Sequence, residues 1–412
     1  MEKKVALRLS MAFAVIYFFS TNGMAALPGL TVNYLLKDVL HMTATQSAYF
    51  AAITMLGWAI KPLWGVISDS FPVFGYRRKS YLIVTSVAAA GIWFTLGRQS
   101  EYTIPLLAAM FIASSFAYAF NDVVCDGLMV ETGKPHGLTG KFQSWQWGAV
   151  YAASIITALA GGWVAAHWSP QTTFTVNGIF PLVVLALVIC FVPEKKSAER
   201  GQWRTSVSAL KSAAKDKTLW LVALFLFLWQ FIPSFGAPFF YYKNDVLKFD
   251  PMFFGILGAV GSAFSLIGAV LFAGYAGKIK TARLINWAII LGVFTTLFDL
   301  AYFTQFVLED VSRARTIALV SGAVLSVIGT FIFLTLLNLS AEVCPKYGEG
   351  TVFAALMSVW NLGGMGSVVL GGWLSGIIGL QPLIVVSALS MLSVWPVARM
   401  LKLDEKSSAR EL

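Results

Sequence analysis

Charged side chains are scarce in this sequence. Asp, Glu, Lys and Arg together make up only 12% of the 412 residues, whereas soluble domains carry about 25%. Hydrophobic residues make up 58%. A soluble fold of this length could not cover its surface with so few charges. The composition therefore excludes an ordinary soluble protein and predicts a multi-pass protein of the lipid bilayer.

Motifs for catalysis and metal binding are also missing. The chain has only three cysteines and three histidines, and no CxxC, HExxH or GxxxxGK[ST] pattern occurs in it. This argues against a disulfide framework, a zinc site and a phosphate-loop ATPase. The longest polar stretch, residues 194–218, is too short for a soluble catalytic domain. We therefore expect no enzymatic activity, no cofactor and no metal site.

Long apolar runs are what the sequence does contain. A helix needs about 20 mostly apolar residues to cross a bilayer. Twelve stretches satisfy this requirement, and their approximate limits are 9–31, 45–68, 80–98, 103–130, 139–165, 174–192, 218–241, 251–276, 282–305, 315–341, 350–376 and 381–401. Their number predicts an all-α membrane protein with 12 transmembrane helices.

The basic residues indicate the orientation of these helices. If the N-terminus is cytoplasmic, most of the 30 lysine and arginine residues fall in inner segments. Positive charge concentrates on the cytoplasmic side of membrane proteins. We therefore expect a multi-pass protein of the cell inner membrane with both termini in the cytoplasm. The net charge of +10 is explained by topology, so no nucleic-acid partner is expected.

The sequence also divides into two similar halves. The basic stretch 194–217 separates an expected six-helix bundle over 1–193 from a second over 218–412. Residues 140–163 and 350–373 each begin with Gly and end in Gly-Gly-Trp. Two pseudo-symmetric six-helix halves joined by an inner linker predict the major facilitator fold, with ligands bound near the midplane.

Four segments resemble the folate–biopterin transporter family of the major facilitator superfamily. They are YLLKDVL (34–40), KPLWGVISDSFPVFGYRRKSYLI (61–83), NDVVCDGLMVE (121–131) and GKFQSWQWG (140–148). The resemblance implies a monomeric, proton-coupled transporter that takes up folate, pterin or a related organic anion by alternating access. Export or import of another small molecule, such as a drug or a peptidoglycan fragment, remains an alternative.

A loop signature accompanies this resemblance. Gly65, Asp69, Arg77 and Arg78 are similar to the glycine, aspartate and basic cluster that follow an even-numbered span in major facilitator proteins. The resemblance implies a cytoplasmic gate whose charge pairs form and break as the two halves move. We assign two further residues to this gate, Glu131 and Glu342, because each lies near the inner end of its span.

Lys61 lies inside the second apolar stretch, where an unpaired charge costs roughly 2.5–3.5 kcal/mol. Asp122 should lie at a similar depth on the fourth span, and Asp126 is one helical turn further along the same face. Lys61 and Asp122 could form a pair in the membrane, and protonation would then release the lysine for an anionic substrate. Alternatively, Lys61 reaches the inner surface and Asp122 pairs with Arg77 or Arg78 as scaffold.

Other polar and aromatic residues in the spans could contact a flat heterocycle. Asparagine and glutamine side chains could bind the edge of a pterin-like ring, and Trp147 could stack on its face. Each could instead be a hydrogen bond between helices, worth about 0.6 kcal/mol. The amide candidates for the substrate site are Asn22, Gln146, Gln230, Asn338 and Asn361.

Overall fold

The structure is a computed structural model of the whole chain. It describes residues 3–20, 23–133, 139–192, 194, 208, 211–212, 214–275, 279–344 and 349–401. These residues form helices and the turns between them, and no strand occurs among them. Ten helical segments within them are long and apolar enough to cross a membrane. The expected all-α architecture with membrane-spanning helices is confirmed, and the expected number of twelve spans stays a prediction.

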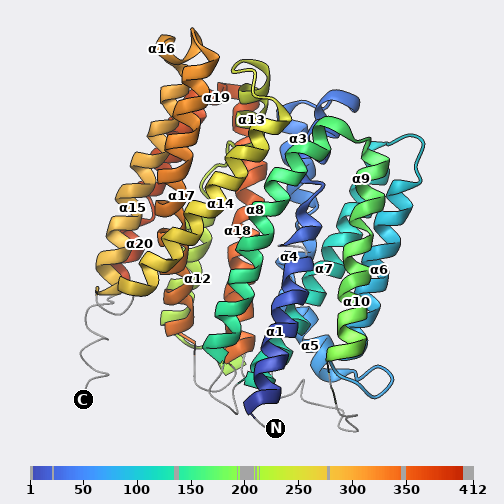
Figure 1. Cartoon of the computed structure of the whole chain (residues 1–412). Helices are drawn as coiled ribbons and strands as arrows, with labels where there is room; N and C mark the ends of the chain where they lie inside the picture. The colour runs from blue at the N-terminus through green and yellow to red at the C-terminus, as the bar shows by residue number, and fades with distance from the viewer. Residues whose placement is uncertain are drawn as a thin grey trace. The chain divides into compact units, whose positions relative to one another are not determined.

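The helices form two compact units (Figure 1). The first contains Met1–His41, Ile53–Ser208 and Pro251–Ala259. The second contains Met42–Ala52, Ala209–Asp250 and Val260–Leu412. Three of the boundaries between these units, at 52/53, 208/209 and 259/260, fall within the expected second span, the basic linker and the expected eighth span. The six-plus-six division expected from the sequence stays a prediction.

The first unit is built around one apolar core. Its core contains Phe13 and Ile16 of α1, Leu82 of α6, Val124 of α7 and Phe142 of α8, all 1% exposed or less. α1 packs along α8, and α6 packs against both α7 and α10 (Figure 1). The helices of this unit are α1 (Lys3–Phe19), η1 (Met24–Ala26), α2 (Gly29–Tyr34), η2 (Leu35–Val39), α4 (Leu56–Ala59), α5 (Lys61–Ser70), α6 (Lys79–Gly97), α7 (Ile104–Gly133), α8 (Thr139–His167), α9 (Pro170–Asn177) and α10 (Ile179–Phe191).

The second unit has a separate core. Phe225 and Leu226 of α12, Ile289 of α15 and Leu339 of α17 are fully buried in it. α12 packs along α18, and α15 lies against α17 and α19. Its helices are α3 (Ala44–Ile53), α12 (Lys217–Gln230), α13 (Gly236–Asp245), most of α14 (Pro251–Tyr275), α15 (Thr281–Phe298), η4 (Asp299–Phe303), α16 (Gln305–Leu308), α17 (Val311–Glu342), α18 (Glu349–Ile378), α19 (Leu380–Leu392) and α20 (Trp395–Met400).

Proline interrupts the expected seventh span. α12 ends at Gln230 and α13 begins at Gly236, with Pro233 between them. Neighbouring helices satisfy the backbone groups that the break frees: Ser387 Oγ donates to the Pro233 carbonyl at 2.7 Å, and Ser234 N donates to the Ser367 carbonyl at 3.0 Å. Such compensation is what allows a helix break at membrane depth.

The expected second span is also divided. It consists of α3, the single turn α4 and α5, with turns at 54–55 and 60. A continuous helix over 45–68 was therefore the wrong expectation for this segment. The interruption places Lys61 at the first residue of α5 rather than within a regular helix.

Candidate functional site

The break before Lys61 is stabilised by its neighbours. Pro62 is tolerated in the first turn of α5 because the backbone N–H groups there have no partner within the helix. The indole of Trp64 donates to the Gly57 carbonyl at 2.9 Å, and the Gly57 N–H donates to Ser115 Oγ at 3.1 Å. A side chain at Gly57 would collide with the backbone at Ser115. The close contact between α4 and α7 fixes the start of α5 and with it the position of Lys61.

Lys61 forms an ion pair with Asp122 of α7. Its Nζ lies 2.7 Å from Asp122 Oδ2, and the two side chains are 16% and 9% exposed. The amine also lies 4.8 Å from the centre of the Trp58 ring, a distance suited to a cation–π interaction. Of the two arrangements that the sequence left open, the Lys61–Asp122 pair is confirmed. The alternative, in which Asp122 pairs with Arg77 or Arg78, is wrong, because the partner of Asp122 is Lys61 and both arginines reach Asp69.

Asp126 lies one turn further along α7 and is held by two donors. The hydroxyl of Tyr17 on α1 and the Nε2 of Gln146 on α8 both donate to Asp126 Oδ1, the latter at 3.3 Å. Among the described residues, Oδ2 of Asp126 has no hydrogen-bond donor. The carboxylate is thus oriented by three helices of the first unit while one oxygen stays available. The sequence did not point to Tyr17, since nothing distinguishes it from the other tyrosines in apolar runs.

A tight turn returns the chain from α5 to α6. Val73 and Tyr76 exchange two backbone hydrogen bonds, at 3.1 and 3.0 Å. The two residues between them have positive φ, 51° at Phe74 and 82° at Gly75. Positive φ at both central positions is the requirement of a type I′ turn, and glycine adopts it without strain. The turn brings the arginines that follow it back toward the end of α5.

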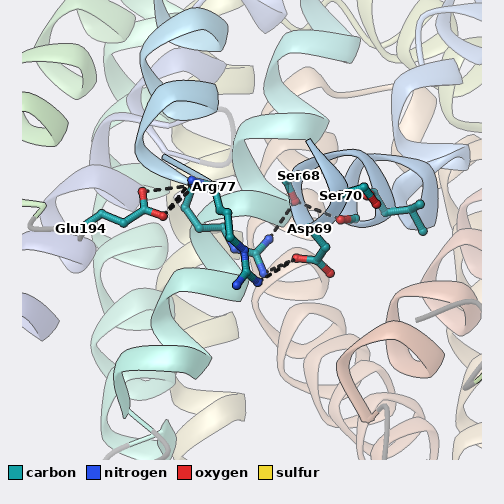
Figure 2. A network of polar contacts seen from close by, with 8 residues as sticks. Ser68, Asp69, Ser70, Arg77 and Glu194 are labelled. Atoms are coloured by element: carbon teal, nitrogen blue, oxygen red, sulfur yellow. Dashed lines mark hydrogen bonds and ion pairs between the residues drawn. The ribbon is translucent and has the colours of Figure 1, made fainter. Parts of the chain in front are cut away.

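Arg78 belongs to a network of polar contacts in this loop, of which Figure 2 labels Ser68, Asp69, Arg77 and Glu194. It is only 6% exposed, and its guanidinium contacts Asp69 Oδ1 at 2.6 Å and Ser68 Oγ at 2.8 Å. Gly127 of α7 leaves room for this group, because a Cβ there would lie 2.9 Å from the guanidinium carbon. Arg77 reaches the same Asp69 oxygen at 3.9 Å. The expected contacts within the loop signature are confirmed, and their role in gating stays a prediction.

Glu194 anchors the other side of this loop. Its carboxylate accepts backbone N–H groups of Arg77, Arg78 and Lys79 at distances from 2.7 to 3.2 Å (Figure 2). These N–H groups belong to the start of α6, where helical donors have no partner within the helix and negative charge is favourable. The sequence interpretation missed this role because it placed Glu194 in the linker.

The remaining predicted residues are not brought to this cluster by the described contacts. Trp147 is 37% exposed and lies beside Tyr151, with ring centres 6.0 Å apart. Gln230, Asn338 and Asn361 belong to the second unit, and their part in a substrate site stays a prediction. Asn22 and the side chains of Glu131 and Glu342 lie outside the described residues.

Comparison with known proteins shows to which family the chain belongs. A sequence profile of the BT1 family matches residues 22–402. The chain belongs to the BT1 family. The folate-biopterin transporter of Synechocystis sp. is 32% identical over 376 residues, which cover 89% of this BT1 chain and 75% of that protein. Probable folate-biopterin transporter 4 of Arabidopsis thaliana is 24% identical over 449 residues, covering 92% and 91% of the two chains. The resemblance found in the sequence is confirmed.

Solved structures agree on the fold of this BT1 protein. A D-xylose-proton symporter has a TM-score of 0.70 at 14% identity, over 98% of this chain and 99% of that one. The nucleoside transporter NupG has the same TM-score and identity, over 97% and 99%. Both are transporters with the major facilitator fold, so the BT1 chain has a fold of this type. At this level of identity the likeness concerns the fold alone.

Proposed function

We propose that this BT1 protein is a secondary transporter that couples proton movement to uptake of a folate, a pterin or a related organic anion. The observation that carries the proposal is the buried Lys61–Asp122 pair, one helical turn from a second oriented carboxylate, Asp126. Ionisable side chains inside a membrane are rare, and they mark substrate and proton pathways. The names of the relatives support the substrate class.

The pair provides a simple means of coupling. While Asp122 is ionised, it holds the Lys61 amine at 2.7 Å. Protonation of Asp122 removes the negative charge and frees the amine to bind an anionic substrate such as the carboxylate of a folate. Release of the substrate and of the proton restores the ion pair. The inward proton gradient supplies the energy, since one charge crossing 100 mV is worth about 2.3 kcal/mol.

Asp126 is suited to recognise the ring of a pterin. The amino-pyrimidine edge of that ring presents N–H donors, and a carboxylate can only accept when ionised. Tyr17 and Gln146 hold Asp126 Oδ1, which leaves Oδ2 for a donor of the substrate. In this assignment Asp122 binds and releases the coupled proton, and Asp126 binds the pterin ring.

The same proposal includes the finer topology. We assign twelve spans in two six-helix halves, 1–193 and 218–412, joined by the linker 194–217, with both termini in the cytoplasm and the monomer as the functional unit. The basic residues of the linker support this orientation. Asp69, Arg77 and Arg78 then lie on the cytoplasmic side and form the gate, with Glu194 as its anchor. No catalytic step is part of this function.

Uptake by purified protein tests the proposal. Labelled folate and biopterin are presented to proteoliposomes with and without an inward proton gradient. We expect the gradient to accelerate uptake and a protonophore to abolish the acceleration. An uptake rate that is the same with and without the gradient would contradict the coupling. If no folate or pterin is taken up and an unrelated compound is transported, the substrate is another small molecule.

A further inference from the structure

A small cavity lies beside Asp122 in the first unit. It has a volume of about 10 Å³, and its lining includes Tyr17 and Ser20 from the α1 segment and Tyr118, Asn121 and Asp122 from α7. A cavity needs about 10–15 Å³ and two to four polar partners to hold a water molecule. The volume therefore suits one water, and the polar lining residues decide whether it is bound.

Asn121 presents an acceptor that nothing in the described part of the chain uses. Its Nδ2 donates to Thr85 Oγ1 at 2.9 Å and lies 3.5 Å from Ser86 Oγ. The Thr85 hydroxyl proton is committed to the Tyr81 carbonyl at 2.8 Å, so Thr85 can only accept from Asn121. This fixes the orientation of the amide. Its Oδ1 is left for another donor, and a buried amide oxygen without a donor is costly.

Tyr118 presents the complementary donor. Its oxygen accepts the Trp93 indole N–H at 2.7 Å, and no acceptor for its own proton occurs among the described residues. Asp122 uses Oδ2 for Lys61, which leaves Oδ1 as a second acceptor. Ser20 donates to the Tyr17 carbonyl at 2.9 Å and can still accept. Tyr118 thus offers a donor, and Asn121, Asp122 and Ser20 offer acceptors, around a space of the size of one water.

We propose that this cavity is a water-binding site that serves the Asp122 carboxyl group in both of its protonation states. The inference rests on the proposed function, in which Asp122 gains and loses a proton during transport. When Asp122 is ionised, the water accepts from Tyr118 and donates to Oδ1 of Asp122 and to Asn121. When Asp122 is protonated, its O–H donates to the water, which turns and donates to Asn121 and Ser20.

The chemistry of the lining favours water over the alternatives. A fixed protein donor facing Oδ1 could not accept the proton that the acid carries at that oxygen, and a fixed acceptor would repel the ionised oxygen, whereas water can both donate and accept there. A metal cation such as Na⁺ fits poorly, because the Tyr118 hydroxyl has no acceptor for its proton within the described part of the chain, and the Lys61 ammonium is bonded to the same carboxyl group. Transport is accordingly expected to be independent of Na⁺.

A high-resolution structure of the purified protein tests the site directly. We expect a density peak within hydrogen-bonding distance of Asn121 Oδ1 and Asp122 Oδ1, present without Na⁺. An empty cavity, in a map that resolves other buried waters, would overturn the proposal. A peak that appears only with Na⁺ would also overturn it and would identify a cation site.

Asn121→Leu tests the role of the water, because leucine has a similar size and cannot accept a hydrogen bond. We expect the ratio of proton-driven to gradient-free folate uptake to fall roughly tenfold, as for loss of one hydrogen bond to a charged group. Asn177→Leu is the matched control. Asn177 is fully buried in the same unit, outside this cavity, and its amide has no partner among the described residues. Equal ratios in the two variants would contradict the proposal.

An infrared titration separates this inference from the proposed function. The carbonyl band of protonated Asp122, assigned by its disappearance in Asp122→Asn, reports hydrogen bonding in the purified protein without any substrate. We expect the band to shift in Asn121→Leu and to stay in place in Asn177→Leu. An unchanged band in Asn121→Leu would overturn the water site even if folate uptake is observed. If the band shifts but the protein takes up no folate, the water site is supported and the proposed substrate is refuted.

Discussion

The two units bury different kinds of polar side chain. Arg78, Asp122 and the amides of Asn121, Gln146 and Asn177 are buried in the first unit. In the described part of the second unit, the buried polar side chains are serines and threonines only. Its ion pair between Arg315 and Asp250 is 39% and 46% exposed. Among the buried polar side chains, the charged and amide groups therefore lie in the first unit, whereas the second unit buries serine and threonine hydroxyls, and its Lys243 and Asp299 are only partly buried.

This difference has a physical reason. A buried hydroxyl can bond to its own helix, as Ser340 Oγ does with the Leu336 carbonyl at 2.8 Å and Thr335 Oγ1 with the Phe331 carbonyl at 2.9 Å. Such groups need no partner on another helix. A buried charge needs a counter-charge held in place by tertiary structure. We therefore expect the proton-dependent steps to depend on the first unit more than on the second.

Loss of Lys61 should have the largest effect. Lys61→Met leaves Asp122 buried without its counter-charge, which costs about 3 kcal/mol in the free energy of unfolding. We also expect proton-driven uptake to be lost. Thermal unfolding in detergent and uptake in proteoliposomes measure the two effects. Lys243→Met of α13 is the matched lysine in the second unit, and a loss of coupling as large as that of Lys61→Met would break the contrast between the units.

Arg78→Lys should have the next largest effect. The guanidinium of Arg78 contacts Ser68 and Asp69 together, whereas a single ammonium cannot reproduce this planar arrangement. We expect unfolding to become easier by about 2 kcal/mol. Arg77→Lys is the control, because Arg77 reaches Asp69 only at 3.9 Å. Denaturation in detergent should therefore rank Arg78→Lys as the more destabilised variant, and the reverse order would refute the role given to Arg78.

Tyr17→Phe should weaken substrate binding without unfolding the protein. The substitution removes the hydroxyl that orients Asp126. We expect the affinity for biopterin to fall about tenfold, the size of one hydrogen bond to a charged group. Equilibrium binding to purified protein gives this value. In the control Tyr102→Phe, the lost hydroxyl donates to the Leu96 carbonyl of the same unit. An equal loss of biopterin affinity in both variants would show that Tyr17 has no specific role in substrate recognition.

Arg315→Gln in the second unit should have the smallest effect. Its ion pair with Asp250 is partly exposed, and exposed pairs contribute under about 1 kcal/mol. We expect near-normal unfolding and normal proton-driven uptake in the same two assays. A loss as large as that of Arg78→Lys would show that the second unit also depends on its charges.

Much of the site followed from the sequence because charges in apolar runs are conspicuous. Lys61 and Asp122 could be placed at one depth by counting residues along two spans that run in the same direction. The contacts of Asp69 with the arginines followed from the loop signature. In both cases the signal was local, and the partner was restricted by the bilayer to a narrow range of depths.

Other parts of the site depend on contacts that no local pattern reveals. The break before Lys61 is stabilised by Ser115, 58 positions further along the chain. Tyr17 contacts Asp126 across 109 positions and resembles any other aromatic residue of an apolar span. Glu194 looked like the start of a polar linker. An acidic residue directly after a span was the only hint that it could reach the start of another helix.

The double variant Lys61→Met/Asp122→Leu tests the coupling role of the pair most directly. It removes both charges, so neither is left buried alone, and replacing a buried pair by apolar residues is often neutral or stabilising. The measurement is folate uptake in proteoliposomes with and without a proton gradient. We expect a folded protein whose uptake no longer responds to the gradient. A folded double variant with wild-type, gradient-driven uptake would show that the pair is only scaffold.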